Sequence, residues 1–183
     1  MDLVLPALVT IVSLAIVAQH AWAGKGHFAS VTLPRGATLL MVAVVTTSLA
    51  YVLLTWRLPA MVPAMIAALV IEFASLVLFW LAIAASRKAR LLLAFDANLP
   101  HSIVQTGPYR VVRHPFYTSY IVFWIGWAIG TWSLWAVPPL VLMIAIYVLA
   151  ARGEEAKFAA TALAADYQQY RRQAGMFWPR LTR

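Results

Sequence analysis

The segment FYTSYIVFWIGWAIGTWSLWAVPPLVLMIAIYVLAA occupies residues 116–151 and is apolar almost throughout. A helix crosses the hydrocarbon core of a bilayer with about 20 residues, so this segment is too long for one crossing. It is interrupted by GTWSLW at residues 130–135 and then by Pro138 and Pro139. The interruption predicts a helical hairpin, in which two membrane-spanning helices are joined by a short turn.

The composition of the whole chain points to the same environment. The 183 residues are 63% hydrophobic with a mean hydropathy of +0.82, and only 11% are charged, whereas a soluble domain has about 25% charged residues. This leaves too little polar surface to cover a water-soluble globule. The sequence therefore predicts an integral membrane protein, and its lack of cysteine excludes disulfides, thiolate metal sites and cysteine nucleophiles.

Three further apolar runs, at residues 3–23, 37–56 and 62–85, are each long enough to cross a bilayer as a helix. Backbone groups in lipid must be hydrogen-bonded within the protein, which requires helices or a closed barrel, and these runs lack the alternation of strands. With the hairpin, the prediction is an all-α integral membrane protein with five transmembrane helices. The first run is expected to be retained rather than cleaved as a signal peptide, because no Lys or Arg precedes Lys25.

The basic residues predict how these helices are oriented. Thirteen of the 14 Lys and Arg residues fall on one side of the membrane, and only Arg57 falls on the other. Basic residues are enriched in cytoplasmic loops, so the N-terminus is expected outside the cell membrane and the C-terminus in the cytoplasm. The residues on the cytoplasmic side are Lys25, Arg35, Arg87, Lys88, Arg90, Arg110, Arg113, Arg152, Lys157, Arg171, Arg172, Arg180 and Arg183.

Polar chemistry is concentrated in two segments of that side. The first is HSIVQTGPYRVVRHPFYTSY at residues 101–120, where Gly107 and Pro108 indicate a turn. Pro115 suits the first turn of a helix, so His114 is expected at a helix N-terminus, where free N–H groups favour an anion. The second is the tail from Arg152 onward, which reads as a helix that continues out of the membrane. Because the chain crosses the membrane twice in the hairpin, Glu155 is expected on the same side of the membrane as His114 and close to it.

Three polar residues have open interpretations. Glu72 is predicted in the middle of a span, where a carboxylate costs at least about 2.5 kcal/mol unless it is protonated or paired. Two interpretations of Glu72 stay open: its carboxylate lines a substrate cavity, or it makes a buried structural hydrogen bond. His20 is expected at the membrane interface, and Glu154 on a solvated helix face.

The polar segments resemble a family of enzymes. HSIVQTGPYRVVRHPFY, followed by EE at residues 154–155 and DYQQY at residues 166–170, is similar to the membrane methyltransferases related to isoprenylcysteine carboxyl methyltransferase and phospholipid N-methyltransferases. Their pattern runs His-x-Leu-Val-x-x-Gly-x-Tyr, Arg-His-Pro-x-Tyr, Glu-Glu and Tyr-x-x-Tyr, and the likeness covers about residues 100–170. It implies a small helical bundle that takes S-adenosylmethionine from the cytosol and a lipophilic acceptor from the bilayer.

This chain departs from the family pattern at three places. Ser119 replaces a glycine, and Leu163 and Ala164 replace Phe-Gly ahead of the tail tyrosines. Ala151 stands where a carboxyl methyltransferase has its substrate arginine, although Arg152 follows it directly. These differences concern the acceptor more than the cofactor.

The resemblance and the chemistry of methyl transfer together predict the site. A sulfonium is attracted by tyrosine ring faces, the carboxylate of the cofactor by a cation, and its ammonium by a carboxylate. No Gly-x-Gly-x-x-Gly occurs, which excludes a Rossmann-type site. The cofactor is therefore expected to bind to the third loop, residues 86–115, and the C-terminal helix. The residues expected to bind S-adenosylmethionine are His101, Ser102, Ile103, Val104, Tyr109, His114 and Glu155. Those expected in catalysis are Arg113, Arg152 and Glu155, and those expected at the substrate are Glu72, Tyr117 and Arg152.

The whole chain, 1–183, is expected to form one methyltransferase domain, with a three-helix part at 1–99 and the cofactor-binding and catalytic part at 100–183. The favoured reaction is carboxyl methylation of an isoprenylcysteine-like amphiphile, and the alternative is N-methylation of a phospholipid or amine head group. An NADPH-binding membrane reductase, a small transporter and a non-catalytic scaffold are the competing classes. The expected partners are a lipophilic substrate and the membrane, without nucleic acid or metal.

Overall fold

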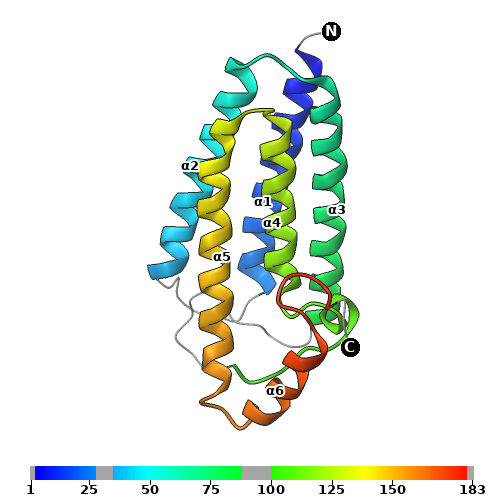
Figure 1. Cartoon of the computed structure of the whole chain (residues 1–183), viewed down its shortest axis with the longest axis vertical. Helices are drawn as coiled ribbons and strands as arrows, with labels where there is room; N and C mark the ends of the chain where they lie inside the picture. The colour runs from blue at the N-terminus through cyan, green and yellow to red at the C-terminus, as the bar shows by residue number, and fades with distance from the viewer. Residues whose placement is uncertain (1–2, 28–34, 88–99, 181–183) are drawn as a thin grey trace.

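The structure is a computed structural model that describes residues 3–27, 35–87 and 100–180. Long helices run side by side in a bundle, and one short helix lies across its end (Figure 1). The α-helices in the described residues are α1 (Val4–His27), α2 (Arg35–Arg57), α3 (Val62–Ser86), α4 (Pro115–Gly130), α5 (Val137–Phe158) and α6 (Ala164–Gln173), with 3₁₀ helices at Gly107–Arg110 and Leu134–Ala136. The prediction of an all-α fold is confirmed for this part of the chain.

Four stretches of the described residues are long and apolar enough to cross a membrane: Val4–Ala23, Gly36–Arg57, Val62–Ser86 and Leu134–Phe158. The helix α4 has 16 residues, which corresponds to roughly 24 Å, and it falls short of a full crossing by that measure. It nevertheless lies along the bundle between its neighbours (Figure 1). The integral membrane character is supported, whereas the count of five crossings stays a prediction.

The predicted hairpin is present as α4 and α5. Its turn contains Trp132 with a positive φ of 49°, and the Ser133 hydroxyl accepts a hydrogen bond from the N–H of Trp135. Pro138 and Pro139 belong to the first turn of α5, where a missing N–H leaves no helical hydrogen bond unmade. Because α1 to α5 alternate in direction, the start of α4 and the end of α5 lie at the same end of the bundle (Figure 1).

Small residues let α3 and α4 approach each other closely. A Cβ on Gly130 would lie 2.9 Å from the Cβ of Ala68, and one on Gly126 would lie 3.0 Å from Cγ2 of Ile71. Glycines four residues apart permit this kind of contact in membrane helices. The tight packing fixes α4, which carries the start of the polar site.

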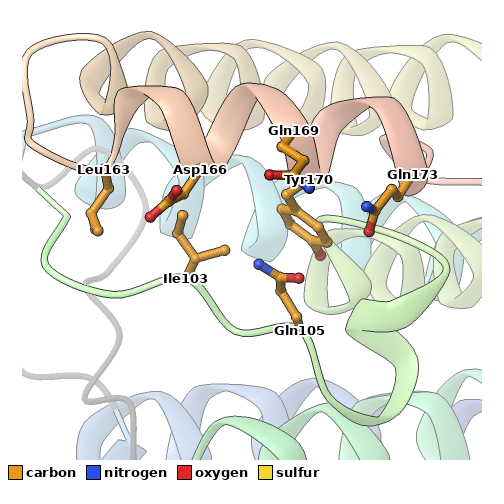
Figure 2. A pocket seen from close by; sticks show the side chains of 7 residues that line it. All are labelled: Ile103, Gln105, Leu163, Asp166, Gln169, Tyr170 and Gln173. Carbon is orange, nitrogen blue, oxygen red and sulfur yellow. The ribbon is translucent and has the colours of Figure 1, made fainter.

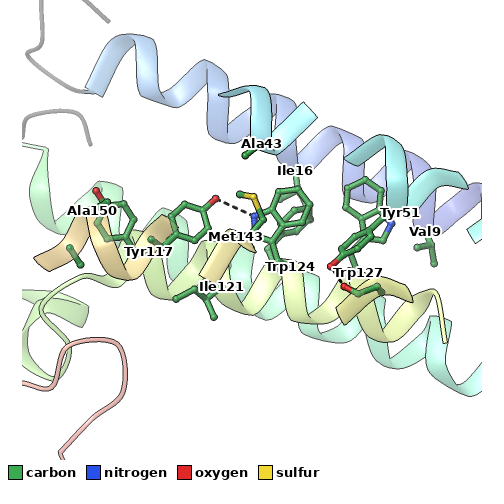
Figure 3. Packing of buried hydrophobic residues seen from close by; sticks show 14 of the residues in the cluster. Val9, Ile16, Ala43, Tyr51, Tyr117, Ile121, Trp124, Trp127, Met143 and Ala150 are labelled. Atoms are coloured by element: carbon green, nitrogen blue, oxygen red, sulfur yellow. Dashed lines mark hydrogen bonds between the residues drawn. The ribbon is translucent and has the colours of Figure 1, made fainter. Parts of the chain in front are cut away.

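Aromatic side chains fill the bundle interior (Figure 3). The rings of Trp124 and Trp127 stack with centroids 5.9 Å apart, and Tyr51 meets Trp127 at 5.6 Å in an edge-on arrangement. The hydroxyl of Tyr51 donates to the carbonyl of Ala136 at 2.9 Å, so the core also binds the hairpin turn to α2.

The predicted helix does continue past Arg152, but it does not run through the whole tail. The chain leaves α5 at Phe158 and re-enters a helix at Ala164, so α6 turns back across the end of the bundle (Figure 1). The Thr161 hydroxyl stabilises this turn with two hydrogen bonds: it donates to the Phe158 carbonyl at 2.8 Å and accepts from the Leu163 N–H at 3.2 Å. The rings of Phe158 and Tyr167 stack 3.9 Å apart, which holds α6 against α5.

Candidate functional site

A tight turn leads the chain into α4. Gly107 has φ +56°, and a Cβ there would lie 2.9 Å from the Cβ of Ala85, so the position requires glycine. The 3₁₀ helix Gly107–Arg110 follows, and His114 then forms the N-cap of α4, with Pro115 in the first turn. The predicted turn and helix start are confirmed.

The C-terminal segment holds this turn in place. Residues 174–177 lie beside residues 111–114, with a parallel bridge between Val112 and Gly175. The N–H of Arg113 donates to the Gly175 carbonyl at 2.8 Å, and the N–H of His114 donates to the Met176 carbonyl at 3.2 Å. A Cβ on Gly175 would overlap the carbonyl oxygen of Trp178 at 1.7 Å, so no larger residue fits there.

Glu155 lies at the centre of a buried ion-pair cluster. One of its carboxylate oxygens is 2.8 Å from Nε of Arg113 and 3.1 Å from Nε2 of His114, and the other is 3.4 Å from Nε of Arg171. The Arg113, His114 and Glu155 side chains are 6%, 9% and 7% exposed. Nη1 of Arg113 also donates to the Ala174 carbonyl at 2.5 Å. The cluster therefore joins α4, α5, α6 and the C-terminal segment.

Glu154 makes a second set of contacts. One oxygen accepts a short hydrogen bond from the Tyr117 hydroxyl, and the other lies 3.6 Å from Nδ1 of His114. Its side chain is 30% exposed, which makes it the most open carboxylate of the cluster. The expectation that Glu154 lies on a solvated helix face was wrong, because the close packing of α4 against α5 brings Tyr117 to it.

His114 lies between the two carboxylates. Burial lowers the pKa of its imidazole, but the hydrogen bonds and charges of Glu154 and Glu155 outweigh burial and raise the pKa above 6.5. The imidazole is therefore more readily protonated than an exposed histidine. The cluster thus combines two guanidinium groups, one imidazole and two carboxylates, and its guanidinium groups suit a bound anionic group.

Tyrosine rings extend from this cluster into the bundle. The Tyr117 ring stacks on His114 at 5.6 Å and on Tyr147 at 5.7 Å, and Tyr147 meets Tyr120 at 5.5 Å. The Tyr147 hydroxyl accepts a hydrogen bond from Nε1 of Trp124 at 3.1 Å. A row of packed tyrosine rings thus leads from Glu154 into the bundle.

A polar groove of about 350 Å³ lies between α6 and the segment before Gly107 (Figure 2). It combines one carboxylate, three amides, one phenol and two aliphatic side chains. The lining residues are Ile103, Gln105, Leu163, Asp166, Gln169, Tyr170 and Gln173. The Tyr170 hydroxyl donates to the carbonyl of Tyr109 at 2.6 Å, which connects one wall of the groove to the turn that carries Arg113 and His114.

The residues predicted from the sequence fall into two groups. Arg113, His114, Tyr117 and Glu155 meet in the cluster, and Ile103 lines the groove. The others lie elsewhere. His101 and Arg152 are exposed, and Ser102 and Val104 are half-buried. Tyr109 packs in the core with Phe79 and Phe116. Glu72 lies in the middle of α3, where its carboxylate accepts a hydrogen bond from the Ser13 hydroxyl at 2.7 Å.

Sequence reasoning missed Arg171 and Asp166 as well as the role of Glu154. Arg171 reaches Glu155 only because α6 folds back beside the end of α5. Asp166 faces the groove for the same reason (Figure 2). The only sequence signal was that both residues lie next to the tail tyrosines.

The described helices form an apolar bundle of the kind that integral membrane proteins have, with a polar cluster at one end. The profile of the phospholipid methyltransferase family matches residues 62–165. This is more than half of the 183 residues, and the chain belongs to that family. Membership confirms the predicted resemblance and implies methyltransferase activity on a lipid in the membrane. No curated protein and no solved structure matches the chain.

Proposed function

We propose that the protein transfers a methyl group from S-adenosylmethionine to the amine of a membrane phospholipid. The observation that carries this proposal is Glu154, a partly exposed carboxylate held by Tyr117 and His114 beside a set of tyrosine rings. A carboxylate next to aromatic faces suits an ammonium head group. The same carboxylate can take the proton that a lipid ammonium must lose before its nitrogen can accept a methyl group.

Carboxyl methylation, favoured by the sequence, is the second candidate. It requires a cation that orients the acid, and Arg152 was expected in that role. Arg152 is exposed on α5, whereas Arg113 and Arg171 are engaged by Glu155. The guanidinium groups of Arg113 and Arg171 could still attract an acid, so the tests below distinguish carboxyl methylation from amine methylation.

The polar groove has hydrogen-bond donors and acceptors of the kind that could bind the nucleoside of S-adenosylmethionine. A carboxylate such as Asp166 accepts hydrogen bonds from ribose hydroxyls, and Gln105 and Gln169 can read the edge of a base beside Ile103. The carboxylate of the cofactor would lie toward Arg113 and the start of α4. When bound, S-adenosylmethionine supplies an electrophilic methyl group on a sulfonium. Glu155 would position Arg113 and His114 rather than contact the substrate, because its two oxygens already contact Arg113, His114 and Arg171.

We further propose that α4 is a fifth crossing and that the cluster faces the cytoplasm. The start of α4, the end of α5 and α6 lie at one end of the bundle (Figure 1). Among the described residues, Arg57 lies at the other end of the bundle, whereas these basic residues belong to elements at that end: Arg35, Arg87, Arg110, Arg113, Arg152, Lys157, Arg171, Arg172 and Arg180. Positive loops are typical of the cytoplasmic side.

Cofactor titration tests the proposal against a reductase. Calorimetry should detect S-adenosylmethionine binding and no NADPH binding. Asp166→Ala should weaken S-adenosylmethionine affinity about tenfold, because a charged hydrogen bond contributes about 1.5–3 kcal/mol. Gln168→Ala is the matched control on the same helix, since Gln168 is exposed and does not line the groove. NADPH binding without S-adenosylmethionine binding would contradict the proposed function.

A further inference from the structure

His20 is a partly buried histidine whose ring packs inside the bundle and which the polar cluster does not use. Its ring centroid lies 4.5 Å from that of Phe79, 4.8 Å from Tyr120 and 5.8 Å from Phe123. The expectation of an interfacial His20 stays a prediction: its ring packs inside the bundle, three residues from the end of the apolar stretch Val4–Ala23. Nε2 of His20 is buried and has no hydrogen-bond partner among the described residues. An unpaired buried polar atom is unfavourable, so packing alone does not account for a histidine here.

Side-chain contacts connect His20 to the candidate site. Its neighbour Tyr120 lies 6.3 Å from the ring of Tyr117, and the Tyr117 hydroxyl donates to Glu154. Tyr120 is five residues into α4, so it lies roughly 8 Å deeper in the bundle than the start of that helix. The head-group layer of one leaflet is of similar thickness, roughly 5–7 Å. His20 therefore lies at the depth where the polar linkage of a lipid begins when its head group is at Glu154.

An apolar groove of about 360 Å³ lies between α1 and α3. Its residues are hydrocarbon except for Gln19, the neighbour of His20. They are Val12, Ala15, Ile16, Gln19, Leu69, Phe73 and Leu76. They occupy the middle of both helices, which is the depth of lipid chains in a spanning bundle. The α1 wall of the groove lies outside residues 62–165, the part that matches the family profile.

We propose that α1 binds the phospholipid acceptor: the groove holds one of its acyl chains, and His20 hydrogen-bonds an ester carbonyl of its glycerol linkage. This rests on the proposed function for the location of the head group. The apolar groove fits an acyl chain. Nε2 of His20 does not line the groove but lies inside the bundle, on the residue after Gln19, and the glycerol linkage of the same diacyl lipid would supply its missing acceptor while the amine reaches the cluster. A helix outside the family region thereby determines which lipid is accepted.

His20→Phe tests the hydrogen bond, because phenylalanine keeps the ring packing and removes the nitrogens. With phosphatidylethanolamine in mixed micelles, KM for the lipid should rise about tenfold, while the Kd of S-adenosylmethionine stays unchanged. The melting temperature should stay equal or rise, because an unpaired polar atom has been removed. A residue that serves only packing would leave KM unchanged, and that result would overturn the role of His20.

A second experiment tests the groove without turnover. Phosphatidylethanolamine with a diazirine on an acyl chain should, on illumination in nanodiscs, label residues of α1 and α3 that line the groove. Ala15→Trp fills the groove and should reduce this labelling severalfold. Ala18→Trp is the matched control, since Ala18 is exposed one turn further along α1 and does not line the groove. Equal labelling in both variants would overturn the proposal, whereas groove labelling without methyl transfer would contradict only the proposed function.

Discussion

Glu155→Gln is expected to destabilise the protein by about 3–5 kcal/mol, because it leaves buried cations without their counter-ion. Arg113 and His114 share one oxygen of Glu155, and both side chains are at most 9% exposed. An amide of the same size fills the space but supplies no charge. The cluster joins α4 to α5 and α6, so the loss should also loosen the groove that is proposed to bind S-adenosylmethionine.

Glu154→Gln is the matched control for that effect. It changes the neighbouring carboxylate, which is 30% exposed and has one hydrogen bond from Tyr117 and a longer contact with His114. An amide oxygen can still accept from Tyr117, so the loss of stability should be much smaller. Thermal unfolding of both variants in the same detergent measures the difference. Equal losses would show that the charges of the two glutamates are equivalent.

The same Glu154→Gln variant is expected to lose turnover by about 10²–10⁴-fold with an amine lipid, since an amide cannot take the proton from the acceptor. Its affinity for S-adenosylmethionine should remain close to that of the unmodified protein, because Glu154 does not line the groove. Turnover is measured as methyl incorporation into phosphatidylethanolamine, with calorimetry as the parallel measurement of cofactor binding.

Arg152→Ala is the control for turnover, because Arg152 is on the same helix and is exposed. For an amine acceptor this variant should retain nearly full activity. If Arg152→Ala abolished methyl transfer and Glu154→Gln retained it, the reaction would be carboxyl methylation, as the sequence favoured, with Arg152 orienting the acid.

The sequence could predict the features that depend on local pattern. Apolar runs of bilayer length predicted the helices, and GTWSLW followed by two prolines predicted the hairpin of α4 and α5. The Arg-His-Pro segment predicted the start of α4 and, with the pair of glutamates, the family. Each of these features is determined by a few consecutive residues, or by the short turn that places the end of α5 beside the start of α4.

The sequence could not predict contacts that depend on where one helix meets another. Glu154 was expected in solvent because no local signal places Tyr117 against it. The return of α6 depends on a turn at Thr161 and on stacking of Phe158 with Tyr167, which are common residues without a turn signature. The packing of His20 against Phe79 and Tyr120 likewise depends on how α1 meets α3 and α4.

The most direct test of the account is methyl transfer by the unmodified protein in nanodiscs that contain phosphatidylethanolamine. S-adenosylmethionine with an isotopically labelled methyl group is added from the aqueous phase, and the extracted lipids are analysed by mass spectrometry. The account predicts labelled N-methylated phosphatidylethanolamine, formed faster as pH rises and the amine deprotonates, and no label on a prenylated thioether acid supplied in parallel. Label on the acid alone, or binding of S-adenosylmethionine without any labelled lipid, would contradict it.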